Sequence, residues 1–267
     1  MVNTLLTATT PYSSKPQQRG FTLVELSIVL VIIGVIAGGV LVGRDLIRST
    51  RIKNMIEEKN TFDAAITQFT DRFSAKPGDF RRATELWGAA ASCAVAETGK
   101  ATCDGNADGK IGPVGQEAER YRIWQHLSNA ELIKGKFNGV NDEPQSDIPT
   151  GKWGLFWLGD SVGNVSGSSA FFNARYGHIL VLGINPSQSA LGDSAVFTSI
   201  LYPAEMRSLD EKYDDGMAGK GNIVTQLGGC ATARNVSAIN SDTDTATYTQ
   251  GLETPTCTII FKNIVGR

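Results

Sequence analysis

The hydrophobic pattern of this chain changes once, close to residue 43. Residues 26–43, LSIVLVIIGVIAGGVLVG, contain no charged side chain. At about 1.5 Å of rise per residue, a helix over this stretch is roughly 27 Å long, which is enough to cross the hydrocarbon core of a bilayer. After Arg44 the apolar residues instead recur at steps of three and four, at Ile52, Met55, Ile56, Phe62, Ile66, Phe69 and Phe73.

The second spacing predicts a helix with one buried stripe. We expect it to continue the apolar stretch, giving a single helix from Phe21 to about Phe73 whose later half packs on a globular domain. The segment Ala75-Lys76-Pro77-Gly78-Asp79 should end this helix, because proline disfavours continuation and glycine permits the turn.

The rest of the chain predicts mixed structure. Residues 88–117 are rich in loop-forming residues, and 117–133 and 203–213 have helical patterns, with Trp124 in the core and His126 at the surface or internally satisfied. Strand signals fall at 153–158, 177–184, 222–226 and 257–265, and the polar residues 241–249 predict an exposed loop. This order indicates an α+β fold in which the long N-terminal helix packs on an antiparallel sheet with loop insertions.

A short motif precedes the apolar stretch: Gly20-Phe21-Thr22-Leu23-Val24-Glu25, with Arg19 before it. An ordinary secretory signal places its apolar stretch before the cleavage site. Here the stretch follows the plausible site, so cleavage after Gly20 would leave the helix on the mature protein and create a new amine at Phe21. Glu25 places a carboxylate at the edge of a segment that excludes charge, which is costly unless a partner neutralises it.

These residues resemble the N-terminus of type IV prepilins and type II secretion pseudopilins, whose signature is Gly-Phe-Thr-x-x-Glu. The likeness covers residues 19–43. It implies that a membrane aspartyl peptidase, the prepilin peptidase, cuts after Gly20 and N-methylates Phe21, and that Glu25 acts in assembly. It also implies a pilin-like fold, which divides the chain into a leader peptide (1–20), a transmembrane and assembly helix (21–43), an amphipathic half of the same helix (44–74) and a globular head (75–267).

The physics of a buried charge agrees with the role that the resemblance gives Glu25. Its carboxylate can neutralise the N-terminal ammonium of a neighbouring subunit's Phe21, and in a low-dielectric core this pairing offsets a large desolvation cost. A subunit docked in the wrong register leaves both charges unpaired, so the pair selects the register. The alternative is a plain single-pass anchor in which Glu25 reaches the membrane interface.

The charges around the apolar stretch bear on orientation. The cations at 44–53 outnumber those at 15–19, which by itself favours an inverted insertion. The resemblance implies instead that the leader lies in the cytoplasm. We therefore expect a single-pass protein of the bacterial inner membrane with its head outside the cytoplasm, and later a filament in the periplasm or at the cell surface.

The chain contains four cysteines: Cys93, Cys103, Cys230 and Cys257. They form no Cys-x-x-Cys pair and no histidine lies at metal-ligand spacing, which argues against zinc. An even number outside the cytoplasm favours disulfides. Of the three pairings, we favour Cys93–Cys103 and Cys230–Cys257, which close short local loops; four reduced thiols are the alternative.

Residues 104–111, DGNADGKI, match the first eight places of an EF-hand-type calcium loop. Oxygens at places one, three and five would come from Asp104, Asn106 and Asp108, and the carbonyl at place seven from Lys110. Gly109, at place six, permits the sharp turn that such a loop requires.

The loop departs from the pattern at place twelve, where Gly115 replaces the usual glutamate. Glu117 or Glu119, at the start of the next helix, would supply the missing carboxylate if the loop bulges. The alternative is a solvated turn closed by the Cys93–Cys103 disulfide. Calcium is the one cofactor that the sequence suggests, and none is required.

Three classes of function follow. The resemblance implies a structural filament subunit: a minor or specialised type IV pilin, because the head is large, or alternatively a type II secretion pseudopilin. A membrane-tethered ligand-binding module is the alternative from another class, with candidate contacts at Trp87, Trp153, Trp157 and Tyr176. Two distant histidines and the absence of Gly-x-Ser-x-Gly, phosphate-loop and HExxH motifs give no support for an enzyme.

The partners implied are the prepilin peptidase, other pilin or pseudopilin subunits, an inner-membrane assembly platform, and membrane lipid before assembly. A formal net charge of −2 gives no reason to expect nucleic acid among them.

Overall fold

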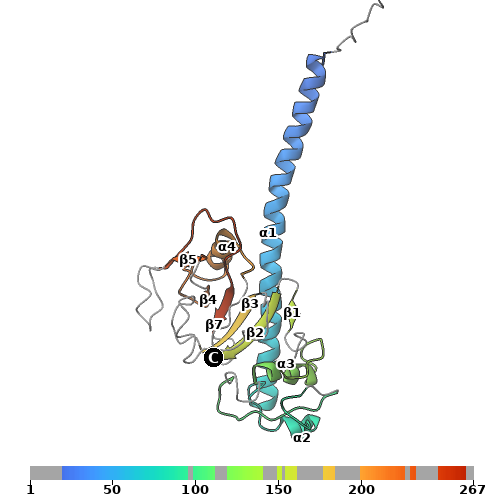
Figure 1. Ribbon diagram of the computed structural model, residues 1–267, viewed down its shortest axis with the longest axis vertical. Coiled ribbons are helices and arrows are strands. Elements are labelled where there is room, and N and C mark those ends of the chain that lie inside the picture. The colour runs from blue at the N-terminus through green and yellow to red at the C-terminus, as the bar shows by residue number, and fades with distance from the viewer. Residues whose placement is uncertain are drawn as a thin grey trace, which may run out of the picture. The chain divides into compact units, whose positions relative to one another are not determined.

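The computed structural model (Figure 1) describes residues 20–95, 99–111, 119–140, 149–151, 154–160, 177–183, 199–225, 229–232 and 246–262, without the side chains of 41, 150–151 and 154–160. The described residues fall into two compact units, one ending at Ser49 and the other beginning at Thr50. A single long helix, α1 (Leu23–Phe73), runs through both. The chain is α+β, with this long helix and a small antiparallel sheet.

Local hydrogen bonds set both ends of α1. At its start, the Thr22 hydroxyl accepts a bond from the Glu25 backbone (3.2 Å), and the Glu25 carboxylate accepts one from the Thr22 backbone (2.8 Å), which together form a capping box. At its end, Ser74 turns to φ 52°, and its N–H donates to the Thr70 carbonyl (2.8 Å). The predicted helix, Phe21 to about Phe73, is confirmed to within two residues.

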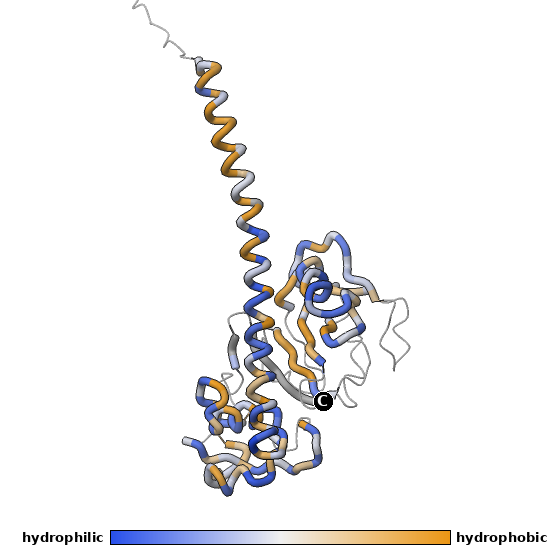
Figure 2. The backbone as a smooth tube through the Cα atoms, turned by 180° about the vertical axis from the view of Figure 1, so that it is seen from behind, coloured by the Kyte–Doolittle hydropathy of each residue, from blue (hydrophilic) through white to orange (hydrophobic). Residues whose placement is uncertain are grey.

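The first unit is an apolar helix without a core. The large apolar side chains described between Phe21 and Ile47 are exposed. Figure 2 colours the backbone by hydropathy and shows hydrophobic positions along this half of the helix. Among the described residues, α1 is the one helix long and apolar enough to cross a membrane, judged by length and composition.

The second unit contains a five-stranded antiparallel sheet in the order β1-β2-β3-β7-β4. Its strands are β1 (Thr150–Gly151), β2 (Gly154–Asp160), β3 (His178–Gly183), β4 (Ile223–Val224) and β7 (Ile259–Lys262). The central pairing sets Leu180 opposite Phe261, and all six β3 residues are buried. The four strand predictions fall on β2, β3, β4 and β7.

Three further helices belong to this unit: α2 (Ala83–Trp87), α3 (Glu119–Asn129) and α4 (Pro203–Tyr213). The prediction for α4 is confirmed at both ends, whereas α3 is shorter than the predicted 117–133. Helix α3 ends early because Glu131 takes a left-handed backbone with φ 62°. Helix α2 was not predicted.

The later half of α1 supplies one wall of the core, as its stripe predicted. Ile66 and Phe69 are buried, and Phe62 packs edge-on against Trp124 of α3 with ring centroids 5.1 Å apart. Trp124 is fully buried, which confirms its predicted place in the core. Arg51 donates to the Ile200 carbonyl (2.7 Å), which ties α1 to the segment before α4.

The prediction of an exposed loop over residues 241–249 was wrong at its end. Thr247–Tyr248 form strand β6, which pairs with β5 (Ala231–Thr232). Tyr248 is buried, and its hydroxyl donates to Asp210 of α4 (2.7 Å). The polar residues of the segment predict exposure, whereas the contact between Tyr248 and Asp210 forms only in the folded chain.

Both disulfides that close local loops are present in the structure. Cys93 bonds to Cys103 and Cys230 bonds to Cys257, over separations of 10 and 27 residues. The second links the β5 region to the segment before β7, and both of its sulfur-bearing residues are fully buried. It therefore joins the small β5-β6 ribbon to the main sheet.

Candidate functional site

The peptide bond between Gly20 and Phe21 lies just outside the regular helix. Both residues are exposed and have non-helical backbone, with Phe21 92% exposed. A peptidase requires such an accessible, unpaired segment, because a helical bond is held by its own hydrogen bonds. Arg19 and Lys15, the basic residues before this site, lie outside the described residues.

Among the described residues, the Glu25 carboxylate bonds to its neighbour Thr22. Its Oε2 accepts from both the backbone and the hydroxyl of Thr22, each at 2.8 Å, and the residue is exposed. In water this local pairing suffices. In an apolar environment it leaves a net negative charge, which needs a cation from outside the described head or from another molecule.

The structure divides the residues of the predicted calcium loop. Asp104 turns toward α2, where its two oxygens accept from the backbone and hydroxyl of Thr84 (2.7 and 3.0 Å). Asn106 accepts from the Asp108 N–H, and Asp108 accepts from the Lys110 N–H, both at 2.8 Å, so each forms a local turn. Glu117 lies outside the described residues.

A different set of carboxylates converges beside this loop. One oxygen from each of Asp79, Asp108 and Glu119 lies within 4.8 Å of the others. Asp79 accepts from the Gly109 N–H (2.8 Å), and Glu119 accepts from the Asn106 N–H (3.2 Å). Sequence reasoning named Asp108 and the alternative Glu119, but treated Asp79 only as part of the turn after α1.

Two glycines make this convergence possible. A side chain at Gly105 would lie 2.4 Å from the Asp79 backbone, and one at Gly78 would lie 2.7 Å from the Glu119 carbonyl oxygen. Gly78 also has φ +87°, which side chains other than glycine rarely adopt. The Gly78-Asp79 turn is thus held closely between the loop and the start of α3.

His126 also holds the Gly78-Asp79 turn in place. Its Nδ1 accepts from the Gly78 N–H (3.0 Å), so Nε2 carries the proton and donates to the Cys103 carbonyl (3.3 Å). Complete burial, with a smaller contribution from the charge of Arg122, lowers the pKa of His126 to about 3, while the bond to the Cys103 carbonyl opposes this shift. His126 is therefore a neutral structural link, which confirms the internally satisfied alternative.

Burial raises the pKa of Asp79 above its ordinary value, and the charge of Asp108 raises it too. The N–H groups of Gly109, Ala107 and Asp108 oppose this rise. The carboxylates of the cluster thus repel one another, and the backbone N–H groups offset this repulsion only in part.

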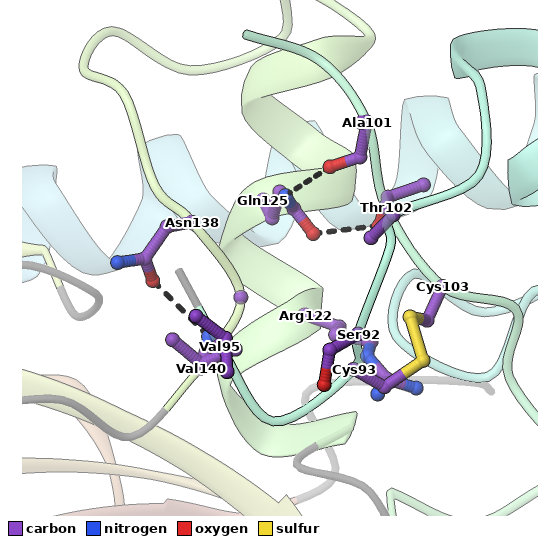
Figure 3. Close-up of a pocket in the computed structure, with 12 residues that line it drawn as sticks. Ser92, Cys93, Val95, Ala101, Thr102, Cys103, Arg122, Gln125, Asn138 and Val140 are labelled. Carbon is purple, nitrogen blue, oxygen red and sulfur yellow. Dashed lines mark hydrogen bonds between the residues drawn. A yellow bond between two sulfur atoms is a disulfide. The ribbon is translucent and has the colours of Figure 1, made fainter. Parts of the chain in front are cut away.

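A small pocket lies beside the Cys93–Cys103 disulfide (Figure 3), with room for about one water molecule. Gln125 crosses it, donating to the Ala101 carbonyl (3.0 Å) and accepting from the Thr102 hydroxyl (2.6 Å). These bonds hold the loop onto α3. The pocket is too small for an organic ligand.

Of the four aromatic residues considered for ligand binding, the structure describes the side chain of one, Trp87. Trp87 is half-buried against Phe73 and Phe80, at centroid distances of 5.8 and 6.2 Å. It therefore contributes to the core. Trp153, Tyr176 and the side chain of Trp157 lie outside the described part of the chain.

A second acidic cluster lies at the end of α4, where Asp210 of the helix meets Asp214 and Asp215. Burial raises the pKa of Asp210 to about 7, with smaller contributions from the charges of Asp215 and Asp214, while the bond from Tyr248 opposes the rise. Asp214 accepts from the backbone of Asn222 and Ile223, and Asp215 from that of Met217. These bonds make the cluster a structured turn.

Comparison with known proteins identifies the N-terminal segment. Residues 15–41 match the family described as the prokaryotic N-terminal methylation motif. No curated protein and no solved structure gave a significant match to the chain. The chain therefore carries the prokaryotic N-terminal methylation motif, on an α+β fold consistent with the type IV prepilin and pseudopilin family.

Proposed function

We propose that this chain is a minor or specialised subunit of a type IV pilus-like filament, cut after Gly20 and N-methylated at Phe21. The methylation motif supports a processed pilin-type or pseudopilin-type subunit, and it points to a structural role rather than to an enzyme. A membrane anchorage through the apolar helix fits the same motif. The subtype, the filament system and the position in the filament belong to the proposal.

The observation that carries the proposal is the contrast between an uncovered apolar helix and the single carboxylate in its first turn. Phe21 to Ile47 expose their large side chains, and Glu25 has only Thr22 as a local partner. Helices of this kind bury their surface against lipid before assembly and against one another in a bundle. Glu25 then pairs with the methylated N-terminus of the neighbouring Phe21, which sets the register.

The size of the head favours a specialised subunit. The second unit begins at Thr50 and carries two disulfides, a sheet and the loop around Cys93–Cys103. A head of this size with such loops has more surface than a repeating subunit needs for packing in a filament. We place the protein at a specialised position in the filament, assembled by an inner-membrane platform together with other pilin subunits.

Mass spectrometry of filaments sheared from intact cells tests this function. We expect an N-terminal peptide that begins at methylated Phe21 and is abundant in the sheared fraction. A cleaved and methylated chain confined to the cell envelope would replace the surface pilus by a type II secretion pseudopilus. Retention of residues 1–20 in every fraction would contradict processing and favour a membrane-tethered binding module.

A further inference from the structure

The carboxylate cluster beside the 104–110 loop has a feature that hydrogen bonding within the protein does not explain. Asp79 is only 4% exposed, yet its Oδ1 has no hydrogen-bond partner among the residues that the structure describes. A buried carboxylate oxygen left without a partner is costly, and native structures rarely retain one without a reason. An ion at the cluster would provide that reason.

Two cations, Lys76 and Arg81, bond to backbone carbonyls of the 104–110 loop. Lys76 donates to the Gly109 carbonyl (2.8 Å), and Arg81 donates to the Asn106 carbonyl (3.0 Å). In the described part of the chain, neither Asp79 nor Asp108 forms an ion pair with a lysine or arginine. Asp79 and Asp108 therefore bring two negative charges close to a third carboxylate, that of Glu119, and these charges repel one another.

Asp79, rather than Asp104, brings a carboxylate to the loop. Both oxygens of Asp104 are bonded to Thr84, so Asp104 faces α2. Asp79 instead lies against the loop and accepts the N–H of Gly109, the glycine at place six. Glu119, from the start of α3, supplies the third carboxylate, which the sequence pattern lacks at place twelve.

We propose that Asp79, Asp108 and Glu119 bind one calcium ion, in an EF-hand-like site assembled from three separate segments of the chain. The donors are all hard oxygens, and they come from a turn, a loop and a helix start, a combination that suits the adaptable coordination of calcium better than the strict octahedron of magnesium. The ion would relieve the repulsion among the carboxylates. It would also fix the loop against α1 and α3.

Calcium titration of the full mature chain in detergent micelles, by calorimetry and by thermal unfolding, tests this site. After treatment with a chelator, we expect one ion per chain with a dissociation constant on the order of 10⁻⁴–10⁻³ M, together with a calcium-dependent rise in Tm. The variants Asp108→Asn and Asp79→Asn should each weaken binding by about tenfold or more, because ligand charge sets affinity. Asp108 is exposed, so Asp108→Asn keeps the test valid if Asp79→Asn does not fold.

Two matched controls separate this site from its alternatives. Asp104→Asn should bind calcium like the unmodified chain, while lowering Tm equally with calcium and with chelator, because it disturbs only the contact with Thr84. Asp215→Asn, in the other acidic cluster, should leave binding unchanged. Loss of binding in either control, or no binding to the unmodified chain at several millimolar calcium, would overturn the proposal.

Discussion

The two halves of α1 form one unbroken helix but differ in how far their apolar side chains are buried. Up to Ser49 its apolar side chains are exposed, as with Ile33 at 56%, whereas from Thr50 they enter a core, as with Ile66 at 2%. In the first half the apolar residues occupy all sides, and in the second they form one stripe. The comparison teaches that the second half is stabilised within the chain, while the first depends on what surrounds it.

Removal of the Glu25 carboxylate should have the largest effect. We expect Glu25→Ala to abolish incorporation into filaments, because the N-terminal ammonium of the next subunit loses its partner. The head should unfold at an unchanged temperature, since the hydrogen bonds described for the Glu25 carboxylate go to Thr22 in the same turn of the helix. Immunodetection of sheared filaments and thermal unfolding of the purified chain measure the two effects.

Glu57→Ala is the matched control for Glu25. Glu57 lies in the later half of the helix, is exposed, and pairs locally with Lys53 at 3.5 Å. An exposed pair of this kind contributes little, so this variant should still assemble. Normal assembly of Glu25→Ala would instead support the tethered-module alternative.

The same isoleucine-to-alanine change in each half should separate the two environments. Ile66→Ala should lower the free energy of unfolding by about 2–5 kcal/mol, because it leaves a cavity in the core. Ile33→Ala should change it by no more than about 0.5 kcal/mol. Denaturant unfolding of the head, followed by fluorescence in detergent, provides the comparison; equal effects would mean that the two halves share one environment.

The two disulfides offer a smaller comparison within the head. Replacement of Cys230 and Cys257 by serine should cost about 3–4 kcal/mol, and replacement of Cys93 and Cys103 about 2–3 kcal/mol. The order follows from the separations of 27 and 10 residues, because a longer loop gains more entropy when it is released. Thermal unfolding of both double variants measures the order, and a reversed order would show that local packing dominates chain entropy.

The smallest expected effect is a pH dependence in the head. Since the pKa of Asp210 is raised from 3.8 to about 7, the folded state holds a proton that the unfolded state releases. Its stabilising contribution is complete below about pH 4 and is lost as the pH rises through about 7. Between about pH 5 and pH 7 the loss should be about 1–2 kcal/mol.

Asp210→Asn isolates this contribution. Asparagine keeps an oxygen that can accept the Tyr248 hydroxyl but does not titrate. The difference in unfolding free energy between this variant and the unmodified chain should therefore change across that pH range. A constant difference would show that Asp210 titrates near its ordinary pKa in the folded protein.

Sequence alone determined the features that depend on local pattern. The bounds of α1 and α4 and the position of the methylation motif follow from neighbouring residues, whereas the sequence only favoured the two disulfide pairings that the structure contains. Hydrophobic periodicity and capping residues act over a few residues, so their effects can be predicted from the sequence alone.

Tertiary structure alone decided which carboxylates meet. Asp79 approaches Gly109 across 30 residues, and Asp210 meets Tyr248 across 38. Loop spacing assigned Asp104 to a calcium site, but the fold gives its oxygens to Thr84 and brings Asp79 against the loop instead. Such contacts depend on close backbone approaches, as at Gly105 and Gly78, and these arise only when separate elements pack together.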